Sequence, residues 1–566
     1  MTPPSSARTR AQESRAAVQR LYIAMRHLFI RGSYKPLGLS GEAIIEALLV
    51  LRPEIYGAIA DPEKVELNGL FYVSQRLPRG IEECRFIRLI SREGFEDSHF
   101  PPIIPPKRRR KAYRIDQEQI FIEMTRGRSD IYDILTHLTF LYIEAEKIRR
   151  NSTDHKGRRK REWAMLQQIV QQEEMGEDYN QEVAFTYLST LLGRTYAETV
   201  SACQRFHDQA EVNSIFHITY WLGKRALAEA EHNEDREITF SSALREKIGH
   251  HYYGEWWAHN IKSHLSRKDL IHRPLHIISA NLHSVMNSLY ALAALNQHQS
   301  FKTLEDVAKV LSLPENEALR GRVQQFARRN GMEQIDDVSG TNISVQIFDT
   351  DNIPLNTLPD EIAWQKPYLQ HEKPVILVMD YAFGEQAYES MDELLKPFEA
   401  ETGEEINLNV QSISIMGKAG ILNGGKGDLM IPTAHIFEGT ADNYPIANQV
   451  KPEELSGHGL SVCVGPMITV LGTSLQNRDI LHYFLHSSWQ AIGLEMEGAH
   501  YQKAIQAAAQ IRNNIRPDIR LNYAYYASDN PLETGSTLAS GSLGISGVKP
   551  TYLITRLFLE KILGPH

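Results

Sequence analysis

The sequence predicts an α/β protein in which an all-helical N-terminal domain is followed by a three-layer α/β domain with a mixed sheet. In the first part, apolar residues recur at helical spacing, as in 14–31, 130–149 and 160–174. Beyond residue 335, short β-branched runs such as PVILVMD and INLNVQSISIM alternate with helical patterns. That alternation is typical of a sheet covered on both faces. We therefore expect domains at 1–334 and 335–566.

Composition excludes several classes of protein. The 566 residues are 42% hydrophobic and 23% charged, a globular balance rather than that of a disordered chain. A net charge of -9 argues against a protein that coats nucleic acid. No run approaches the roughly 18–20 apolar residues of a membrane span. Three scattered cysteines favour a reduced setting. We expect a cytoplasmic protein without membrane or nucleic-acid partners.

The segment 100–111 (FPPIIPPKRRRK) predicts a linker inside the helical half, because prolines interrupt helices and favour extended chain. The KRRRK run, 107–111, could bind phosphates or an acidic partner. The alternative is a solvated loop.

Two polar segments of the helical half are ambiguous. His251, Glu255 and His259 would share one helical face and could bind a metal. However, Gly254 weakens the helix, and no metal motif matches. An aromatic packing seam is the simpler interpretation, so we expect no metal site. In 272–295, polar residues at near-helical spacing could complete a site or bridge helices.

The first of three segments that carry chemistry follows an apolar strand in 412–435. The strand runs into Gly417, Lys418, Ala419 and Gly420. Small residues let the backbone approach a ligand, and exposed amides there favour an anion or a sugar. A tight turn is the alternative.

The second segment places Glu495 and Glu497 on either side of Met496, directly after an apolar strand and before a helix. Residues two apart on an extended chain share a face, so both carboxylates could enter one pocket. The alternative is a capping carboxylate and a surface acid.

In the third segment a strand dense in aromatic residues ends at Ser528 and Asp529, and Asn530 and Pro531 follow. Asp529 could form an Asx turn or act as an acid at the carboxyl end of the sheet, where ligands usually bind.

Taken in this order, GKAG, EME and SDNPL resemble motifs of the purine nucleoside phosphorylase and nucleosidase superfamily, and SDNPL is similar to a motif of AMP nucleosidases. The resemblance covers about 340–566 and implies a nucleoside-phosphorylase-like α/β fold. It implies that Met496 and Glu497 hold the ribose, with Glu495 as the accompanying acid. It also implies that Asp529 hydrogen-bonds or protonates N7 of the purine. The remaining substrate-binding residues would be Gly417, Lys418, Ala419, Gly420, Ser528 and Asn530.

The chemistry of these residue types agrees with the resemblance. Cleaving a purine N-glycosidic bond needs a proton on the departing base and negative charge near an oxocarbenium-like sugar. Burial would raise the pKa of Asp529 enough for it to donate, and Glu497 could accept two sugar hydroxyls. Tyr523, Tyr525 and Tyr526 are candidates to stack on the base, although strand alternation puts some of them in the core.

The resemblance therefore implies an enzyme, a purine nucleoside or nucleotide N-glycosidase that hydrolyses its substrate without a cofactor. One alternative is a phosphate-dependent phosphorylase, but the phosphate-binding arginines of that class have no clear counterpart. The other is a catalytically inactive nucleotide-sensing or assembly module. Family members form dimers, trimers or hexamers, so the resemblance also implies a homo-oligomer.

Two departures from the family pattern bear on the site. Lys418 interrupts the small residues, and it could anchor a substrate phosphate or pair with Glu495 or Asp428. The first strand of the family is expected near 343–349 and is followed by only a short segment before Val375, so the resemblance does not assign the residue that activates water. Asp380 and Glu385 are candidates for that role.

Overall fold

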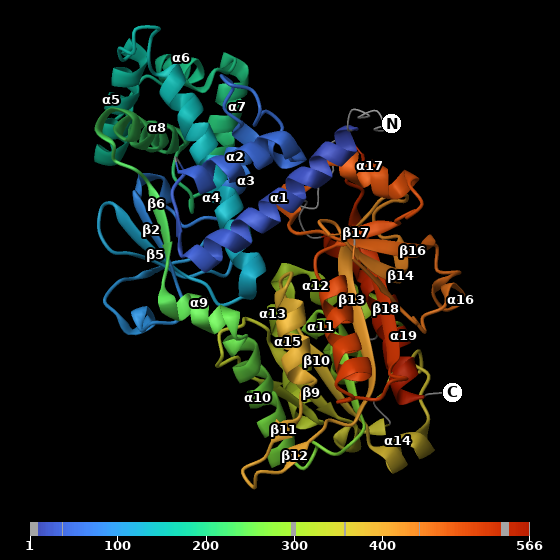
Figure 1. Cartoon of the computed structure of the whole chain (residues 1–566). Coiled ribbons are helices and arrows are strands. Elements are labelled where there is room, and N and C mark those ends of the chain that lie inside the picture. Colours follow the sequence, from blue (N-terminus) through green and yellow to red (C-terminus); the bar gives the residue numbers. More distant parts are fainter. Residues whose placement is uncertain are drawn as a thin grey trace, which may run out of the picture. The chain divides into compact units, whose positions relative to one another are not determined.

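The computed structural model of the chain describes residues 9–36, 38–295, 301–355, 358–440, 442–533 and 543–564. It divides into two compact units (Figure 1). The first comprises 1–250 and 474–480, and the second comprises 251–473 and 481–566. The observed division therefore differs from the predicted boundary near residue 335.

The first unit contains a six-stranded sheet in the order β1-β6-β2-β5-β4-β3. β2 pairs in parallel with both β5 and β6. The prediction of an all-helical N-terminal domain is wrong, because the longest of these strands has five residues, too few to stand out against helical periodicity. The strands are β1 (Ser33–Tyr34), β2 (Phe86–Ile90), β3 (Pro102–Ile103), β4 (Ala112–Arg114), β5 (Gln119–Glu123) and β6 (Glu237–Phe240).

The helices of the first unit gather around α4 (Gly127–Asn151), which is buried along most of its length. Phe140 of α4 stacks on Tyr56, with ring centroids 4.2 Å apart. A capping box starts α7: Thr195 Oγ1 accepts from Glu198 N, and the Glu198 carboxylate accepts from Thr195 N. The other helices are α1 (Arg10–Arg31), α2 (Leu39–Leu51), α3 (Leu67–Ser74), α5 (Arg161–Met175), α6 (Gln181–Leu192), α7 (Tyr196–His207), α8 (Ile215–His232) and α9 (Ser242–Gly249).

The segment 474–480 completes the first unit from far along the chain. Asn477 Nδ2 donates to Leu51 O at 2.8 Å, and Glu54 N donates to Gln476 O at 2.9 Å. The first unit is therefore built from two separate stretches of sequence.

The predicted linker 100–111 is part of the first unit's sheet and core. β3 pairs with β4, and two arginines of the KRRRK run bind acids of α4. Arg108 Nη2 lies 2.7 Å from Asp133 Oδ1, and Arg110 Nη2 lies 2.9 Å from Asp130 Oδ1. Burial alone would raise the pKa of Asp133, but Arg108 and His137 hold it well below its usual range. These two arginines are therefore not part of a solvated loop, and their guanidinium groups are already bound to carboxylates instead of being free to bind phosphate.

The second unit contains a ten-stranded mixed sheet in the order β15-β14-β16-β17-β13-β7-β10-β9-β8, and β18 pairs with both β13 and β14. β13, β18, β14, β16 and β17 therefore close into a ring, a small barrel at one end of the sheet. The strands are β7 (Leu275–Ser279), β8 (Met332–Ile335), β9 (Val345–Asp349), β10 (Val375–Met379), β13 (Val410–Ile421), β14 (Leu429–Phe437), β15 (Asn443–Pro445), β16 (Val462–Thr469), β17 (Gly493–Glu495) and β18 (Arg520–Asp529).

Helices cover both faces of this sheet, as the alternation of apolar strands and helices predicts. Leu377 of β10 packs in one apolar cluster with residues of α10, α15 and α18. Its neighbour Val378 belongs to a second cluster with residues of α11, α12, α13 and α19. These helices are α10 (Tyr252–Arg267), α11 (Leu282–Leu295), α12 (Leu304–Ser312), α13 (Glu317–Arg329), α15 (Gln386–Leu394), α18 (Gly498–Gln506) and α19 (Val548–Leu563); α14 (Lys366–Glu372), α16 (Pro452–Leu455), α17 (Arg478–His486), β11 (Phe398–Glu399) and β12 (Glu405–Ile406) complete the regular elements.

The central strand of the sheet comes from the predicted helical half. β7 lies between β10 and β13 and is parallel to both. The strand expected first, near 343–349, does form as β9, but it runs antiparallel to β10 on the side away from β7. A five-residue apolar run such as β7 cannot be distinguished from a turn of buried helix by its periodicity.

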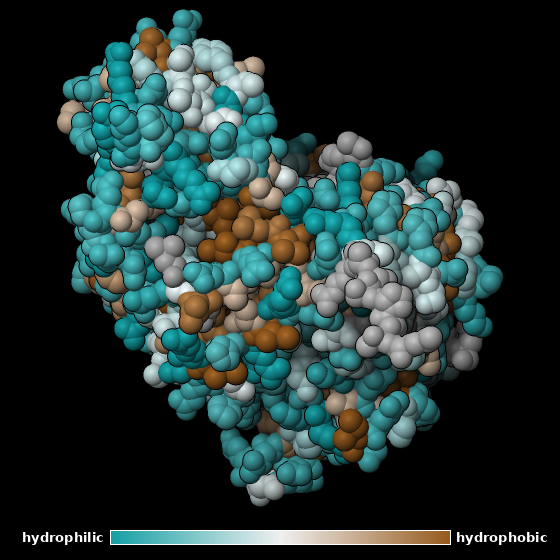
Figure 2. All heavy atoms as spheres, turned by 45° about the horizontal axis from the view of Figure 1, so that its top comes forward, coloured by the Kyte–Doolittle hydropathy of each residue, from teal (hydrophilic) through white to brown (hydrophobic). Residues whose placement is uncertain are grey.

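Most of the surface in Figure 2 is hydrophilic, with scattered apolar areas. Large exposed apolar side chains include Leu39, Met175 and Ile511. Within the described ranges, no helix combines the length and the apolar character needed to cross a membrane.

We expect Asp133→Asn to lower the free energy of unfolding of the first unit by about 3–5 kcal/mol, because it removes the carboxylate that binds Arg108 and one of the two that bind buried Arg110. Urea denaturation followed by circular dichroism measures the change. Glu231→Gln is the control, since Glu231 pairs with Arg159 at the surface and its loss should cost at most about 1 kcal/mol. Equal effects of the two substitutions would contradict a structural role for the buried pair.

Candidate functional site

The three segments singled out in the sequence lie on adjacent strands of the barrel. Gly420 of β13 is in register with Asp529 of β18 on one side and with Leu494 of β17 on the other. The GKAG, EME and SDNPL segments are therefore side by side.

β13 changes partner at the GKAG segment. Its last register partner on β7 is Ser279, opposite Ile415, and its first on β17 is Leu494, opposite Gly420. Between these two points, β18 is the only described strand that pairs with β13. Ligands of α/β sheets usually bind where the strands on either side of a crevice diverge. The backbone of 416–419 lies at such a point.

Glu495 is committed to internal contacts at the end of β17. Its carboxylate accepts from Thr469 Oγ1 and from Glu497 N, both at 2.5 Å, and also from Gly498 N. His435 Nδ1 lies 3.3 Å from Glu495 Oε1. Burial alone would raise the pKa of Glu495, but His435 and Thr469 bring it below its usual value. Glu495 is therefore the capping carboxylate of the alternative interpretation, and it binds the backbone amides at the start of α18.

Glu497, at the N-cap of α18, is half-buried and points to a different loop. Its Oε1 accepts from Gly384 N at 3.0 Å, in the loop between β10 and α15. One turn further along α18, Tyr501 OH lies 3.1 Å from Ser279 Oγ at the end of β7. The carboxyl ends of β7 and β10 thus meet the start of α18. Met496 is half-buried between the two glutamates.

Asp529 is completely buried at the end of β18. Ser528 Oγ lies 2.5 Å from its Oδ1, whereas Oδ2 has no hydrogen-bond partner among the described residues. Burial raises the pKa of Asp529, although Ser528, Lys418 and Lys426 oppose the shift. A carboxyl in this state can hold a proton closer to neutral pH and donate it.

Asn530, not Asp529, forms the turn after β18. Its Oδ1 accepts from Leu532 N at 3.0 Å, which is the pattern of an Asx turn. Its Nδ2 donates to Gly424 O at 3.1 Å. The Asn530 side chain therefore links the turn after β18 to the loop at Gly424.

Lys418 is exposed and is in register with Tyr526 of β18. In the described part of the chain, neither Glu495 nor Asp428 lies within ion-pair distance of it. Asp428 instead accepts from Gly425 N at 2.8 Å and Ser461 N at 3.1 Å. The positive charge of Lys418 opposes the rise in the pKa of Asp529.

His435 of β14 is a buried residue of this region for which no role was predicted. Its ring lies against Tyr523 and Tyr525, with centroids 5.3 and 5.9 Å away. A β-carbon at position 498 would overlap the His435 ring, so glycine at this position lets α18 start directly against that ring. A single histidine in an apolar strand carries no sequence signal for this contact.

Asp380 and Glu385, the candidates to activate water, lie on either side of Gly384 in the loop that donates to Glu497. The polar segment 272–295 of the sequence forms β7 and α11, so it belongs to the sheet that carries the site.

The face of His251, Glu255 and His259 does not form a group with metal-ligand geometry among the described residues. Gly254 allows α10 and α15 to approach closely, because a β-carbon there would lie 3.2 Å from Glu389 O of α15. Trp257 is buried and its Nε1 donates to Ile343 O at 3.0 Å. This region is therefore a packing seam between helices.

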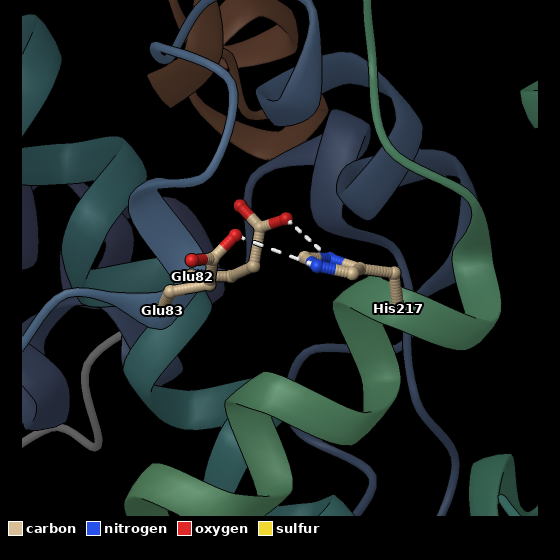
Figure 3. A group of neighbouring side chains, drawn as sticks. All are labelled: Glu82, Glu83 and His217. Carbon is tan, nitrogen blue, oxygen red and sulfur yellow. Dashed lines mark hydrogen bonds and ion pairs between the residues drawn. The ribbon is translucent and has the colours of Figure 1, made fainter. Parts of the chain in front are cut away.

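Glu82, Glu83 and His217 of the first unit could hold a metal by their proximity (Figure 3). His217 Nδ1 lies 3.1 Å from Glu82 Oε1, and Nε2 lies 3.4 Å from Glu83 Oε1. Each nitrogen faces a different carboxylate, whereas an ion can be bound by only one nitrogen of a ring. Burial alone would lower the pKa of His217, but Glu82 and Glu83 raise it above its ordinary value. The group is better suited to hold an imidazolium than a metal.

This group predicts a pH dependence of stability. The pKa of His217 in the folded protein lies above its ordinary value of 6.5. Protonated His217 therefore adds to the free energy of unfolding below about pH 6.5, and this stabilisation is lost as the pH rises through the folded pKa. We expect the melting temperature of the first unit to fall between pH 6 and 8 by more in the wild type than in His217→Gln, with exposed His27→Gln as the control. Parallel curves for His217→Gln and the wild type, or a rise in melting temperature with Zn²⁺, would contradict the assignment.

The contact between Gly498 and His435 gives another prediction. We expect Gly498→Ala to lower the free energy of unfolding by about 1–3 kcal/mol through overpacking, and His435→Ala in the same chain to restore part of it. Urea denaturation measures both. Gly321→Ala is the control, because Gly321 lies in α13 with no atom near its added β-carbon and the change should be neutral or stabilising. A fully stable Gly498→Ala variant would exclude the overlap.

Several solved structures of other proteins are similar to about half of this chain. The 5'-methylthioadenosine/S-adenosyl homocysteine nucleosidase of Campylobacter jejuni is similar at 11% identity over 51% of this chain and 99% of its own, with a TM-score of 0.29. The futalosine hydrolase of Helicobacter pylori is similar at 11% identity over 50% of this chain and 98% of its own, with a TM-score of 0.28. The uridine phosphorylase of Schistosoma mansoni in complex with uracil is similar at 13% identity over 50% of this chain and 86% of its own, with a TM-score of 0.29.

No curated protein matches the chain. A family model described as a family of unknown function, DUF6909, matches residues 42–310 and 310–564. These two matches span most of both units, and the chain therefore belongs to the DUF6909 family.

Proposed function

We propose that the second unit is a purine nucleoside or nucleotide N-glycosidase, similar to AMP nucleosidases, that hydrolyses the N-glycosidic bond and releases the free base. The observation that carries the proposal is the position of a buried carboxyl with a raised pKa, Asp529, on the strand next to Gly420. The EME segment, with Glu497, follows the strand on the other side of Gly420. The proposed acid is thus on one neighbour of β13, and the proposed carboxylate follows two residues after the end of the other neighbour, β17.

In the proposed reaction, Asp529 donates its proton to N7 of the purine as the bond to the sugar breaks. Ser528 orients the carboxyl through Oδ1, which leaves Oδ2 for the base. Protonation makes the base a better leaving group, and such a step contributes about 10²–10⁴-fold to the rate.

Glu497 would accept hydrogen bonds from the sugar hydroxyls, and its negative charge would stabilise the oxocarbenium-like transition state. The Gly384 amide holds Oε1 in place, while Met496 would pack against the sugar. Glu495 would act indirectly, because its contacts fix the backbone of Glu497 and the start of α18.

The small residues Gly417, Ala419 and Gly420 would let the substrate approach the unpaired edge of β13. Lys418 would place a cation near Asp529, where it can bind an anionic substituent of the substrate. We also expect a homo-oligomer, as the family resemblance implies.

The test is to incubate the full chain with AMP and with adenosine, each with and without phosphate, and to measure free base by chromatography. We expect base release without phosphate, and a loss of about 10²–10⁴-fold in kcat for Asp529→Asn because the proton donor is removed. Activity should fall as the pH rises through the raised pKa of Asp529, since the acid must be protonated.

Asp518→Asn is the matched control, because Asp518 is an exposed aspartate just before β18 that pairs with Arg516. It should keep wild-type activity. Base release that strictly requires phosphate would instead identify a phosphorylase. Stabilisation by nucleotides without release of base would identify a nucleotide-sensing module.

A further inference from the structure

Two tyrosines of β18 face the same side of the strand but differ in the state of their hydroxyls. Tyr523 OH donates to Gln502 Oε1 of α18 at 3.0 Å. The hydroxyl of Tyr525 is buried and has no hydrogen-bond partner among the described residues. Both rings pack against His435. The pair therefore offers a direct comparison of a satisfied and an unsatisfied hydroxyl in one environment.

A buried hydroxyl without a partner destabilises the folded protein, because it gives up its hydrogen bonds to water and gains none. Phenylalanine would fill the same space without that penalty. Since Tyr525 is only 4% exposed, solvent cannot supply the missing bond at the surface. A tyrosine in this position needs a reason other than packing.

The surroundings of Tyr525 belong to the proposed site. It is in register with Gly417 of β13 and with Met430 of β14, and a β-carbon on Gly417 would lie 3.4 Å from its ring. Burial, followed by the charges of Glu495 and Glu497, raises the pKa of Tyr525 well above its usual value. The hydroxyl therefore keeps its proton and remains a donor. The same β-carbon on Gly417 would lie 4.0 Å from Tyr381 Cε1, in the loop whose Gly384 amide donates to Glu497, so the Tyr525 ring and this loop approach the same point of β13.

We propose that the Tyr525 hydroxyl is a ligand-binding group that donates a hydrogen bond to an oxygen of the sugar held by Glu497. A sugar hydroxyl can donate to the Glu497 carboxylate and accept from Tyr525 at the same time, so the two side chains would hold one polyhydroxyl ligand between them. This inference rests on the proposed function, because it takes the sugar position from Glu497. It gives Tyr525 a role through its hydroxyl, whereas Tyr523 serves the fold.

The experiment compares Tyr525→Phe with Tyr523→Phe in the full chain. Without ligand, Tyr525→Phe should keep or raise the melting temperature, whereas Tyr523→Phe should lower it by about 1–3 °C through loss of the bond to Gln502. With adenosine and with AMP, Tyr525→Phe should raise Kd and KM about five- to tenfold, whereas Tyr523→Phe should leave both unchanged. Free adenine has no sugar, so its Kd should be the same in the wild type and in Tyr525→Phe.

Four other outcomes would each contradict a different part of the inference. Wild-type Kd and KM for Tyr525→Phe, in a chain that cleaves adenosine or AMP, would exclude the contact and leave the proposed function intact. A lower melting temperature of Tyr525→Phe without ligand would show that the hydroxyl already has a partner, such as an internal water. A higher Kd for adenine in Tyr525→Phe than in the wild type would show that the hydroxyl contacts the base and not the sugar. A wild-type chain that neither binds nor cleaves either compound would overturn the proposed function together with this inference.

Discussion

The architecture of the second unit depends on the hydrogen bonding of one long strand. β13 spans 12 residues, and it is paired with β18 along one edge while its other edge is shared between β7 and β17. A strand has only two edges for pairing, so the change of partner leaves a short length of backbone between them. The flat part of the sheet ends there and the barrel begins. The segments that carry Glu497 and Asp529 are brought to this point by the same pairing.

Two buried carboxylates, Asp133 and Asp529, differ in how completely they are paired. In the first unit, carboxylates such as Asp133 are saturated by arginines, which makes them structural. Asp529 in the second unit accepts one hydrogen bond from a hydroxyl, and its other oxygen has no partner among the residues that the structure describes. An incompletely satisfied carboxyl is costly to bury, and this difference is why we propose Asp529 as a group that takes part in chemistry.

The sequence was informative where a pattern was long or strictly ordered. Helices such as α4 and the alternation of strands and helices after residue 335 follow from periodicity, and the adjacency of the GKAG, EME and SDNPL segments agrees with the order of their motifs. The short strands of the first unit and β7 were missed, because runs of five residues or fewer carry no period of their own. The buried contacts of Glu495 and His435 could not be predicted, because they depend on strands that meet only when the barrel closes. Likewise, the ion pairs of Arg108 and Arg110 with acids of α4 are tertiary contacts, which a local run of charges does not reveal.

The return of the chain at 474–480 affects how the protein can be made and divided. The first unit needs Gln476 and Asn477 to meet the backbone near Leu51 and Glu54, although most of the second unit's sequence lies between these stretches. During synthesis the amino-terminal unit stays incomplete until the ribosome has passed residue 480. A single proteolytic cut cannot release either unit whole, so the two are topologically interleaved despite being separately packed.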